Sequence, residues 1–145
     1  MIRDVVERDL AEVIVLLKQL SPYPVDPDPD VLRAKMREIE GCEHVKVFGY
    51  ESETKIVGMC TVGRVEGLSK GCRPFAVIEN VVVQDSMRRK GIGTALVCHA
   101  ADQAEKWNCY KVVLETGTKN EGKLHFYEKC GFGRGDKTAF IKRFG

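Results

Sequence analysis

The chain has 145 residues, of which 43% are hydrophobic, and this is enough apolar material for one packed domain of ordinary size. Its 23 basic and 21 acidic residues nearly cancel, and such a balance argues against a dedicated nucleic-acid-binding protein. Charged residues interrupt the N-terminal segment, and no later apolar run approaches the roughly 20 residues of a membrane-spanning helix, so we expect no membrane partner.

The N-terminal part of the chain predicts a strand followed by two helices. Residues 2–6 are a strand candidate, and apolar residues then recur at helical spacing over residues 10–20, behind Asp9 as an N-cap residue. Four prolines exclude a continuous helix from residues 21–30, and the helical pattern resumes over residues 31–40. Residues 21–30 are therefore predicted to be a loop between two helices.

A run of three strands is predicted next. Two β-branched segments, 45–50 and 56–62, are joined by a polar turn, which indicates an antiparallel hairpin. A polar loop then leads to a third strand at residues 75–83. This third strand precedes the glycine-containing turn on which the functional interpretation depends.

The C-terminal part predicts alternating helices and strands. A helix follows the glycine-containing turn, with one apolar face made by Ile92, Leu96, Ala100, Ala104 and Trp107. A strand at residues 111–115 is expected to run parallel to strand 75–83. A short helix at 123–130 and a last strand at 138–143 complete the prediction, which is a single α/β domain at residues 1–145.

The six cysteines are scattered along the chain. They form no C-x-x-C pair and have no histidine at metal-ligand spacing, so neither a metal site nor a redox motif is expected. We expect most of them to be core thiols, and we expect the protein to be cytoplasmic and reduced.

The segment from residue 78 to residue 96 predicts a strand, an anion-binding loop and a helix. The first amides of a helix have no partner within the helix and lie at the positive end of its dipole, so they attract phosphate. Gly91 and Gly93 allow positive φ and a close approach of the backbone to a ligand, and Arg88, Arg89 and Lys90 add positive charge. The implied ligand carries a diphosphate or a similar anion.

Two other phosphate loops fit these residues poorly. The dinucleotide fingerprint requires a third small residue where Leu96 stands, and it requires a tight turn where the seven residues from Gln84 to Lys90 intervene, although Glu115 lies near the expected acidic position. The Walker motif requires a lysine between the last glycine and Thr94, and none is present. A Rossmann fold is thus a poor alternative, and a P-loop is excluded.

The loop at Arg88 to Gly93 resembles the R/Q-x-x-G-x-G/A signature of the GNAT superfamily of N-acetyltransferases. A second stretch, from Asn120 through Tyr127 to Phe132, is similar to the other signature of that family. The resemblance implies the GNAT fold, a mixed and mostly antiparallel sheet flanked by helices, with a splayed pair of parallel strands. It also implies an enzyme that uses acetyl-CoA as co-substrate and needs no metal.

The resemblance also assigns roles to residues. It implies that the coenzyme binds to Val81, Val82, Val83, Arg88, Arg89, Lys90, Gly91, Ile92, Gly93, Thr94, Asn120, Tyr127 and Lys129. Tyr127 is expected to give a proton to the departing thiolate. Either Glu79 or Glu115 is a candidate base, and a structural role for each of them remains open. Lys123 departs from the family pattern, because a small residue commonly stands there.

For the acceptor, several adjacent residues look like the glucosamine 6-phosphate N-acetyltransferase branch. We expect a small-molecule primary amine, with an aminosugar phosphate first, and a homodimer. A cationic grip for the phosphate is expected from Lys119, Lys123, Arg134 and Lys137, while Tyr23 and Asp26 are candidates for contact with the amine. The alternatives are a protein N-terminal or lysine acetyltransferase and a non-catalytic acyl-CoA sensor, and the latter would need no Tyr127.

Overall fold

The structure is a computed structural model that describes residues 1–20 and 28–144. Its contacts divide the chain into two units, Met1–Leu114 and Glu115–Gly145. The predicted loop residues Tyr23 and Asp26 lie outside the described residues.

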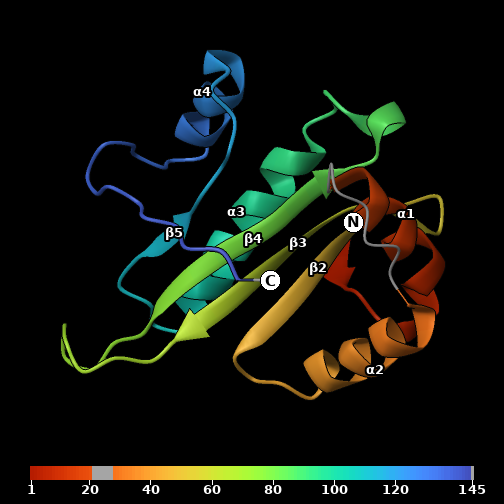
Figure 1. Cartoon of the computed structure of the whole chain (residues 1–145), viewed down its shortest axis with the longest axis horizontal. Helices are drawn as coiled ribbons and strands as arrows, with labels where there is room; N and C mark the ends of the chain where they lie inside the picture. Colours follow the sequence, from red (N-terminus) through yellow and green to blue (C-terminus); the bar gives the residue numbers. More distant parts are fainter. Residues whose placement is uncertain (21–27, 145) are drawn as a thin grey trace. The chain divides into compact units, whose positions relative to one another are not determined.

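The first unit is built on a five-stranded sheet whose strands follow one another in chain order (Figure 1). The strands are β1 (Ile2–Asp4), β2 (Val45–Ser52), β3 (Lys55–Val65), β4 (Phe75–Val83) and β5 (Val112–Leu114). The first four strands pair antiparallel, and β4 pairs with β5 in parallel. The predicted hairpin, the third strand at residues 75–83 and the parallel pair are thus confirmed, although β5 is two residues shorter than predicted.

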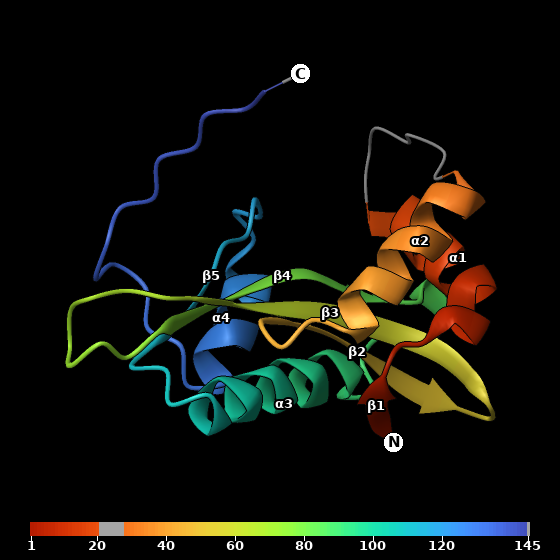
Figure 2. The same cartoon turned by 90° about the horizontal axis from the view of Figure 1, so that it is seen from below.

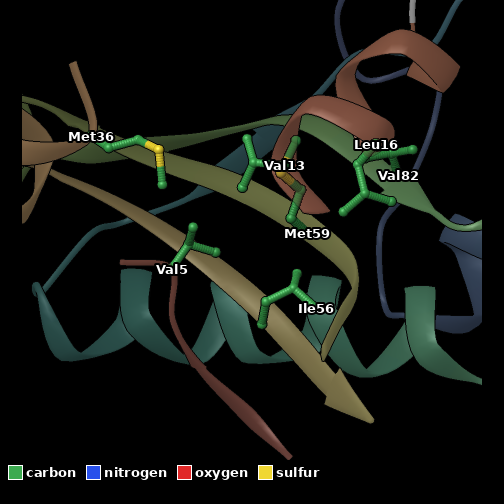
Figure 3. Close-up of a cluster of buried hydrophobic side chains, with 7 residues drawn as sticks. All are labelled: Val5, Val13, Leu16, Met36, Ile56, Met59 and Val82. Atoms are coloured by element: carbon green, nitrogen blue, oxygen red, sulfur yellow. The ribbon is translucent and has the colours of Figure 1, made fainter. Parts of the chain in front are cut away.

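Helices cover both faces of this sheet (Figure 2). Helices α1 (Leu10–Leu20) and α2 (Pro29–Glu40) lie on one face, and α3 (Ile92–Lys106) lies on the other. Figure 3 shows the core between the sheet and the helices α1 and α2. Side chains of both helices, of the sheet strands and of the segment that follows β1 meet there, namely Val5, Val13, Leu16, Met36, Ile56, Met59 and Val82. This core fixes α1 against the sheet.

The predicted apolar face of α3 is also confirmed. Ile92, Leu96, Ala100 and Ala104 are buried, together with Val97. Trp107 instead follows the helix as its C-cap residue, where its ring lies 5.7 Å from the guanidinium carbon of Arg64. Gly58 on β3 lies under the first turns of this helix, because an added Cβ would meet the side chains of Ile92 and Leu96.

Two predictions near the N-terminus are wrong in detail. Asp9 is not an N-cap residue; it ends a 3₁₀ turn (Glu7–Asp9), and its carboxylate accepts hydrogen bonds from the Val6 amide and the Arg3 guanidinium. Pro29 is not part of the loop, because α2 starts there. The N-cap residue is Asp28, whose side chain accepts hydrogen bonds from the amides of Asp30 and Val31. Proline fits this first helical position because its missing N–H would have no partner in the helix.

The second unit contains one helix, α4 (Glu121–Lys129), which begins two residues before the predicted helix. The predicted strand at residues 138–143 is wrong: in the described part of the chain these residues pair with no strand. A strand depends on a neighbour for its hydrogen bonds, so β-forming residues alone do not make one. Phe140, Ile141 and Phe144 are left exposed.

The cysteines are less buried than predicted. Only Cys60 and Cys109 are buried, while Cys42 and Cys130 are half-buried and Cys72 and Cys98 are exposed. Among the described helices, none combines the length and the apolar character needed to cross a bilayer.

Candidate functional site

The end of β4 departs from regular pairing through a β-bulge. Met59 lies opposite Val82 and Thr61 lies opposite Glu79, so the single residue Cys60 faces two residues of β4, Asn80 and Val81. Asn80 has a φ of 56°, in the left-handed region that asparagine tolerates better than β-branched residues do. The bulge therefore changes the direction of β4 just before the predicted anion-binding loop.

The same stretch of β4 separates from its parallel neighbour. Pairing with β5 runs from Ala76 to Ile78 and stops there, so residues 79–83 have an edge that no described strand covers. The Gln84 amide donates to the Val57 carbonyl on β3 at 2.8 Å. Because successive amides of a strand alternate in direction, those of Val81 and Val83 point toward the open edge, whereas that of Val82 points toward β3.

A short connection leads from β4 to α3. It contains a 3₁₀ turn (Asp85–Met87), and the Arg88 guanidinium lies 2.9 Å from the Asp85 carboxylate. Arg89 has a φ of 63° and Gly91 a φ of 79°, so left-handed residues alternate with others through the turn. Gly91 is the N-cap residue of α3, as expected of a glycine that supplies positive φ, while Gly93 lies inside the first turn of the helix.

The start of α3 presents an electropositive backbone. The amide of Ala95 donates to the Gly91 carbonyl at 3.0 Å, and this is the first hydrogen bond of the helix. The amides of Ile92, Gly93 and Thr94 precede it and therefore have no acceptor within the helix. The first turn of α3 carries no acidic residue, and Arg88, Arg89 and Lys90 directly precede it. The arrangement suits a polyanion such as a diphosphate.

The two candidate bases are both exposed carboxylates. Glu79 stands on β4 directly before the bulge residue Asn80, on the segment that β5 no longer covers. Glu115 follows β5 and is the first residue of the second unit. Both are open to water, which is compatible with proton transfer through solvent.

Tyr127 is a half-buried residue of α4. Burial raises the pKa of its phenol, and a hydrogen bond with Thr116 opposes this rise only in part. The ring of Phe126 stands edge-on to it at a centroid distance of 4.8 Å. The phenol therefore remains protonated at neutral pH, as a proton donor must.

Other predicted residues of the second unit have identifiable local roles. Asn120 is the N-cap of α4, with its side-chain oxygen accepting from the Lys123 amide at 3.2 Å. Lys129 is the exposed last residue of that helix. Arg134 is ion-paired with Glu121 at 2.8 Å and lies 3.5 Å from Glu128, which engages its charge within the unit. All four members of the predicted cationic grip are exposed, namely Lys119, Lys123, Arg134 and Lys137.

Sequence reasoning missed two residues of this site. Asn80 creates the bulge, and its signal was an asparagine within a β-branched run, where that residue type is unfavourable. Gln19 on α1 makes hydrogen bonds to the backbone of Val83 and Asp85, and no local sequence pattern predicts a contact between residues so far apart in the chain. Within the described residues, no cluster of His, Cys, Asp or Glu could hold a metal ion.

Comparison with known proteins agrees with this geometry. The model of the acetyltransferase (GNAT) family matches residues 13–132. A glucosamine 6-phosphate N-acetyltransferase of Trypanosoma brucei brucei is 34% identical over 127 residues, which cover 87% of this chain and 84% of that protein.

Two solved structures are similar over nearly their whole length. A putative acetyltransferase from Agrobacterium tumefaciens is 30% identical with a TM-score of 0.90, and the match covers 99% of both chains. The glucosamine-6-phosphate N-acetyltransferase of Arabidopsis thaliana is 28% identical with a TM-score of 0.86, covering 99% of this chain and 97% of that one. The strand order and the helices on both faces of the sheet are therefore those of a known enzyme fold.

Proposed function

We propose that this chain, which belongs to the GNAT family of acetyltransferases, transfers an acetyl group directly from acetyl-CoA to the primary amine of an aminosugar phosphate. The family and its relatives establish the coarser activity: the chain is an acetyl-CoA-dependent N-acetyltransferase. The amine acceptor and the roles of individual residues are the proposal. The anion-binding loop between the bulged end of β4 and the first turn of α3 is the observation that carries the roles assigned to the coenzyme-binding residues.

Most of the proposed coenzyme contacts lie in the first unit. The amides of Ile92, Gly93 and Thr94 would bind its phosphates, with Arg88, Arg89 and Lys90 adding charge. Acetyl-CoA supplies the thioester. Along the open edge of β4, the amides of Val81 and Val83 would bond its amide-containing arm and polarise the carbonyl, while the Val82 amide points toward β3.

The proton transfers are assigned to three side chains. The amine nitrogen attacks the thioester carbonyl carbon, and its proton passes through water to Glu79 or Glu115. The carbon–sulfur bond then breaks, and the thiolate takes a proton from Tyr127, whose raised pKa keeps it protonated until that moment. Asn120 supports this helix by capping it, and Lys129 offers a further positive charge for the coenzyme.

The acceptor proposal rests on the names of the relatives and on exposed charge. Several curated relatives are named glucosamine 6-phosphate N-acetyltransferases. We assign the phosphate grip to Lys119, Lys123 and Lys137, since Arg134 is already paired with Glu121. Lysine ammonium groups bind phosphate as point charges, so the grip would discriminate the 6-phosphate from the free sugar.

A homodimer and a cytoplasmic location complete the proposal. Phe140 and Phe144 are 92% and 84% exposed, and large apolar side chains this exposed on a terminal segment are explained if a second copy covers them. The family match crosses residue 114, which supports one acetyltransferase domain made of both units. Cys42, Cys60, Cys72, Cys98 and Cys109 are free thiols, as expected in a reducing compartment.

An acceptor screen that detects released thiol tests the proposal. It compares glucosamine 6-phosphate, glucosamine, polyamines, aminoalkylphosphonates and N-terminal peptides. We expect the 6-phosphate to have the highest kcat/KM, and we expect Lys123→Ala to raise its KM without changing the KM of glucosamine. Lys35→Ala on α2 is the matched control, because its ammonium pairs with Glu38 in the first unit.

Three results would contradict the proposal. Faster turnover of glucosamine than of its 6-phosphate would remove the cationic grip. Turnover of peptides alone would establish protein acetylation instead. Tight binding of acetyl-CoA without turnover of any amine would indicate an acyl-CoA sensor.

A further inference from the structure

A glutamine on α1 bonds to the backbone at the point where β4 gives way to the coenzyme loop. The Nε2 atom of Gln19 donates to the Val83 carbonyl at 2.6 Å, and its Oε1 atom accepts from the Asp85 amide at 3.0 Å. The side-chain amide therefore both donates to and accepts from the main chain, as the backbone of a neighbouring strand would. The contact connects residues that are 64 and 66 positions apart in the sequence.

This contact holds the chain from the side that lacks a strand. On the other side, the Gln84 amide donates to the Val57 carbonyl of β3 at 2.8 Å. Residues 83–85 are thus fixed between β3 and α1, although β5 stops pairing at Ile78. Since the amide of Val83 points to the open edge, its direction depends on how the Val83 carbonyl is held.

The effect of Gln19 extends along the loop. Asp85, whose amide Gln19 accepts, also pairs through its carboxylate with the Arg88 guanidinium at 2.9 Å. The Arg88 amide reaches the Asp85 carbonyl at 3.4 Å, which closes the 3₁₀ turn. Because Gln19 fixes the backbone of Asp85, it also influences where the Arg88 guanidinium lies.

The helix that carries Gln19 is itself held firmly. Val13 and Leu16 of α1 are buried in the core cluster with Met59 and Val82 of the sheet, as Figure 3 shows. Gln19 lies one turn beyond Leu16, so the core determines where its amide stands. The side chain is half-buried, and its bond to Val83 is partly shielded from water.

We propose that Gln19 is a positioning residue, which holds the end of β4 and the start of the loop in the conformation that binds acetyl-CoA. The inference rests on the proposed coenzyme site and adds to it a residue from another element. Gln19 makes no contact with the reacting atoms in this account. It acts through the backbone of Val83 and Asp85 and, through Asp85, on Arg88.

The variant Gln19→Leu tests this, because it keeps the size and helix propensity of the side chain and removes both hydrogen bonds. We expect the Kd for coenzyme A and the KM for acetyl-CoA to rise about tenfold, as the loss of two ordinary hydrogen bonds predicts. The kcat at saturating coenzyme should change less than about threefold, and hydrogen exchange at residues 85–89 should become faster.

Val15→Ala is the matched control, since it shortens an exposed side chain of the same helix and leaves both Gln19 and the buried core in place. It should leave the midpoint of thermal unfolding and the coenzyme Kd close to those of the parent. An unchanged Kd or unchanged exchange in Gln19→Leu would overturn the inference. If the parent protein fails to bind coenzyme A, the proposed function is wrong, and the exchange at residues 85–89 still decides separately whether Gln19 holds the loop.

Discussion

Replacing Gly58 with alanine tests how closely α3 lies on the sheet beside the coenzyme loop. A Cβ at this position of β3 would lie 3.1 Å from Cγ2 of Ile92 and 3.2 Å from both Cδ1 of Leu96 and the carbonyl oxygen of Val82. Ile92 and Leu96 are only 4% and 0% exposed, and the third neighbour is backbone. Relief of these short contacts would therefore require buried side chains or the backbone to shift.

The expected magnitude follows from two opposing effects. Overfilling a packed core costs about 1–3 kcal/mol. The loss of backbone freedom in the unfolded chain favours alanine over glycine by about 0.4–1 kcal/mol. The free energy of unfolding should therefore fall by about 1–2 kcal/mol, which corresponds to a Tm lower by roughly 3–7 °C for a chain of this size.

The assay is thermal unfolding followed by circular dichroism, and the control is Gly63→Ala in the same strand. The nearest atom to a Cβ at Gly63 is the His44 carbonyl oxygen at 4.0 Å, so this variant should be as stable as the parent or slightly more stable. Because Ile92 starts the helix that carries the loop, Gly58→Ala should also weaken binding of coenzyme A. If Gly58→Ala were as stable as Gly63→Ala, the close packing of α3 would be refuted.

Three further predictions concern single residues. Tyr127→Phe should lower kcat by about 10²–10⁴-fold and leave coenzyme affinity unchanged. Because burial raises the pKa of this phenol above its ordinary value, kcat of the parent should show no loss from Tyr127 at neutral pH. Equal kcat in both proteins would make Tyr127 structural. Asp9→Asn should lower the free energy of unfolding at pH 7 by about 2–4 kcal/mol, because it leaves the Arg3 guanidinium and the Val6 amide short of a strong acceptor. Burial alone would raise the pKa of Asp9, yet hydrogen bonds from Arg3 and Val6 lower it overall. In denaturation at several pH values, the stabilisation by the Asp9 carboxylate should therefore be complete above about pH 4 and lost as pH falls below it. A parent protein with the same pH dependence as Asp9→Asn would contradict this. Alkylation at pH 8 followed by mass spectrometry should leave Cys60 unmodified, since burial raises its pKa to about 12. The exposed thiols of Cys72 and Cys98 should react first. Early labelling of Cys60 would contradict its place in the core.

Elements with a strong local signal were predictable from the sequence. The strand at residues 75–83 has the predicted bounds, because Pro74 and a polar loop precede it and a basic, glycine-containing turn follows it. The buried face of α3 follows from apolar residues at steps of three and four, beginning with Ile92 and Leu96. Gly91 was identified because only a residue that tolerates positive φ suits its place.

What the sequence did not predict depends on partners that are distant in the chain. The residues at 138–143 favour a strand by type, yet the described chain provides no neighbour with which they pair. Asp9 carries the side chain of an N-cap residue, but its pairing with Arg3 and Val6 places it at the end of a 3₁₀ turn. Gln19 reaches the coenzyme loop only because the core positions α1 on the sheet.

The central claim is that the first turn of α3 and its basic loop bind acetyl-CoA, and calorimetric titration tests it most directly. The parent should bind acetyl-CoA with a Kd in the low-micromolar range. Gly93→Asp should abolish the heat of binding, because it places a carboxylate among the amides assigned to the diphosphate. Gly67→Asp makes the same change of charge where a Cβ has no neighbour within 4 Å, and it should bind like the parent. Equal heats from Gly93→Asp and the parent would contradict the assignment of the coenzyme to this loop.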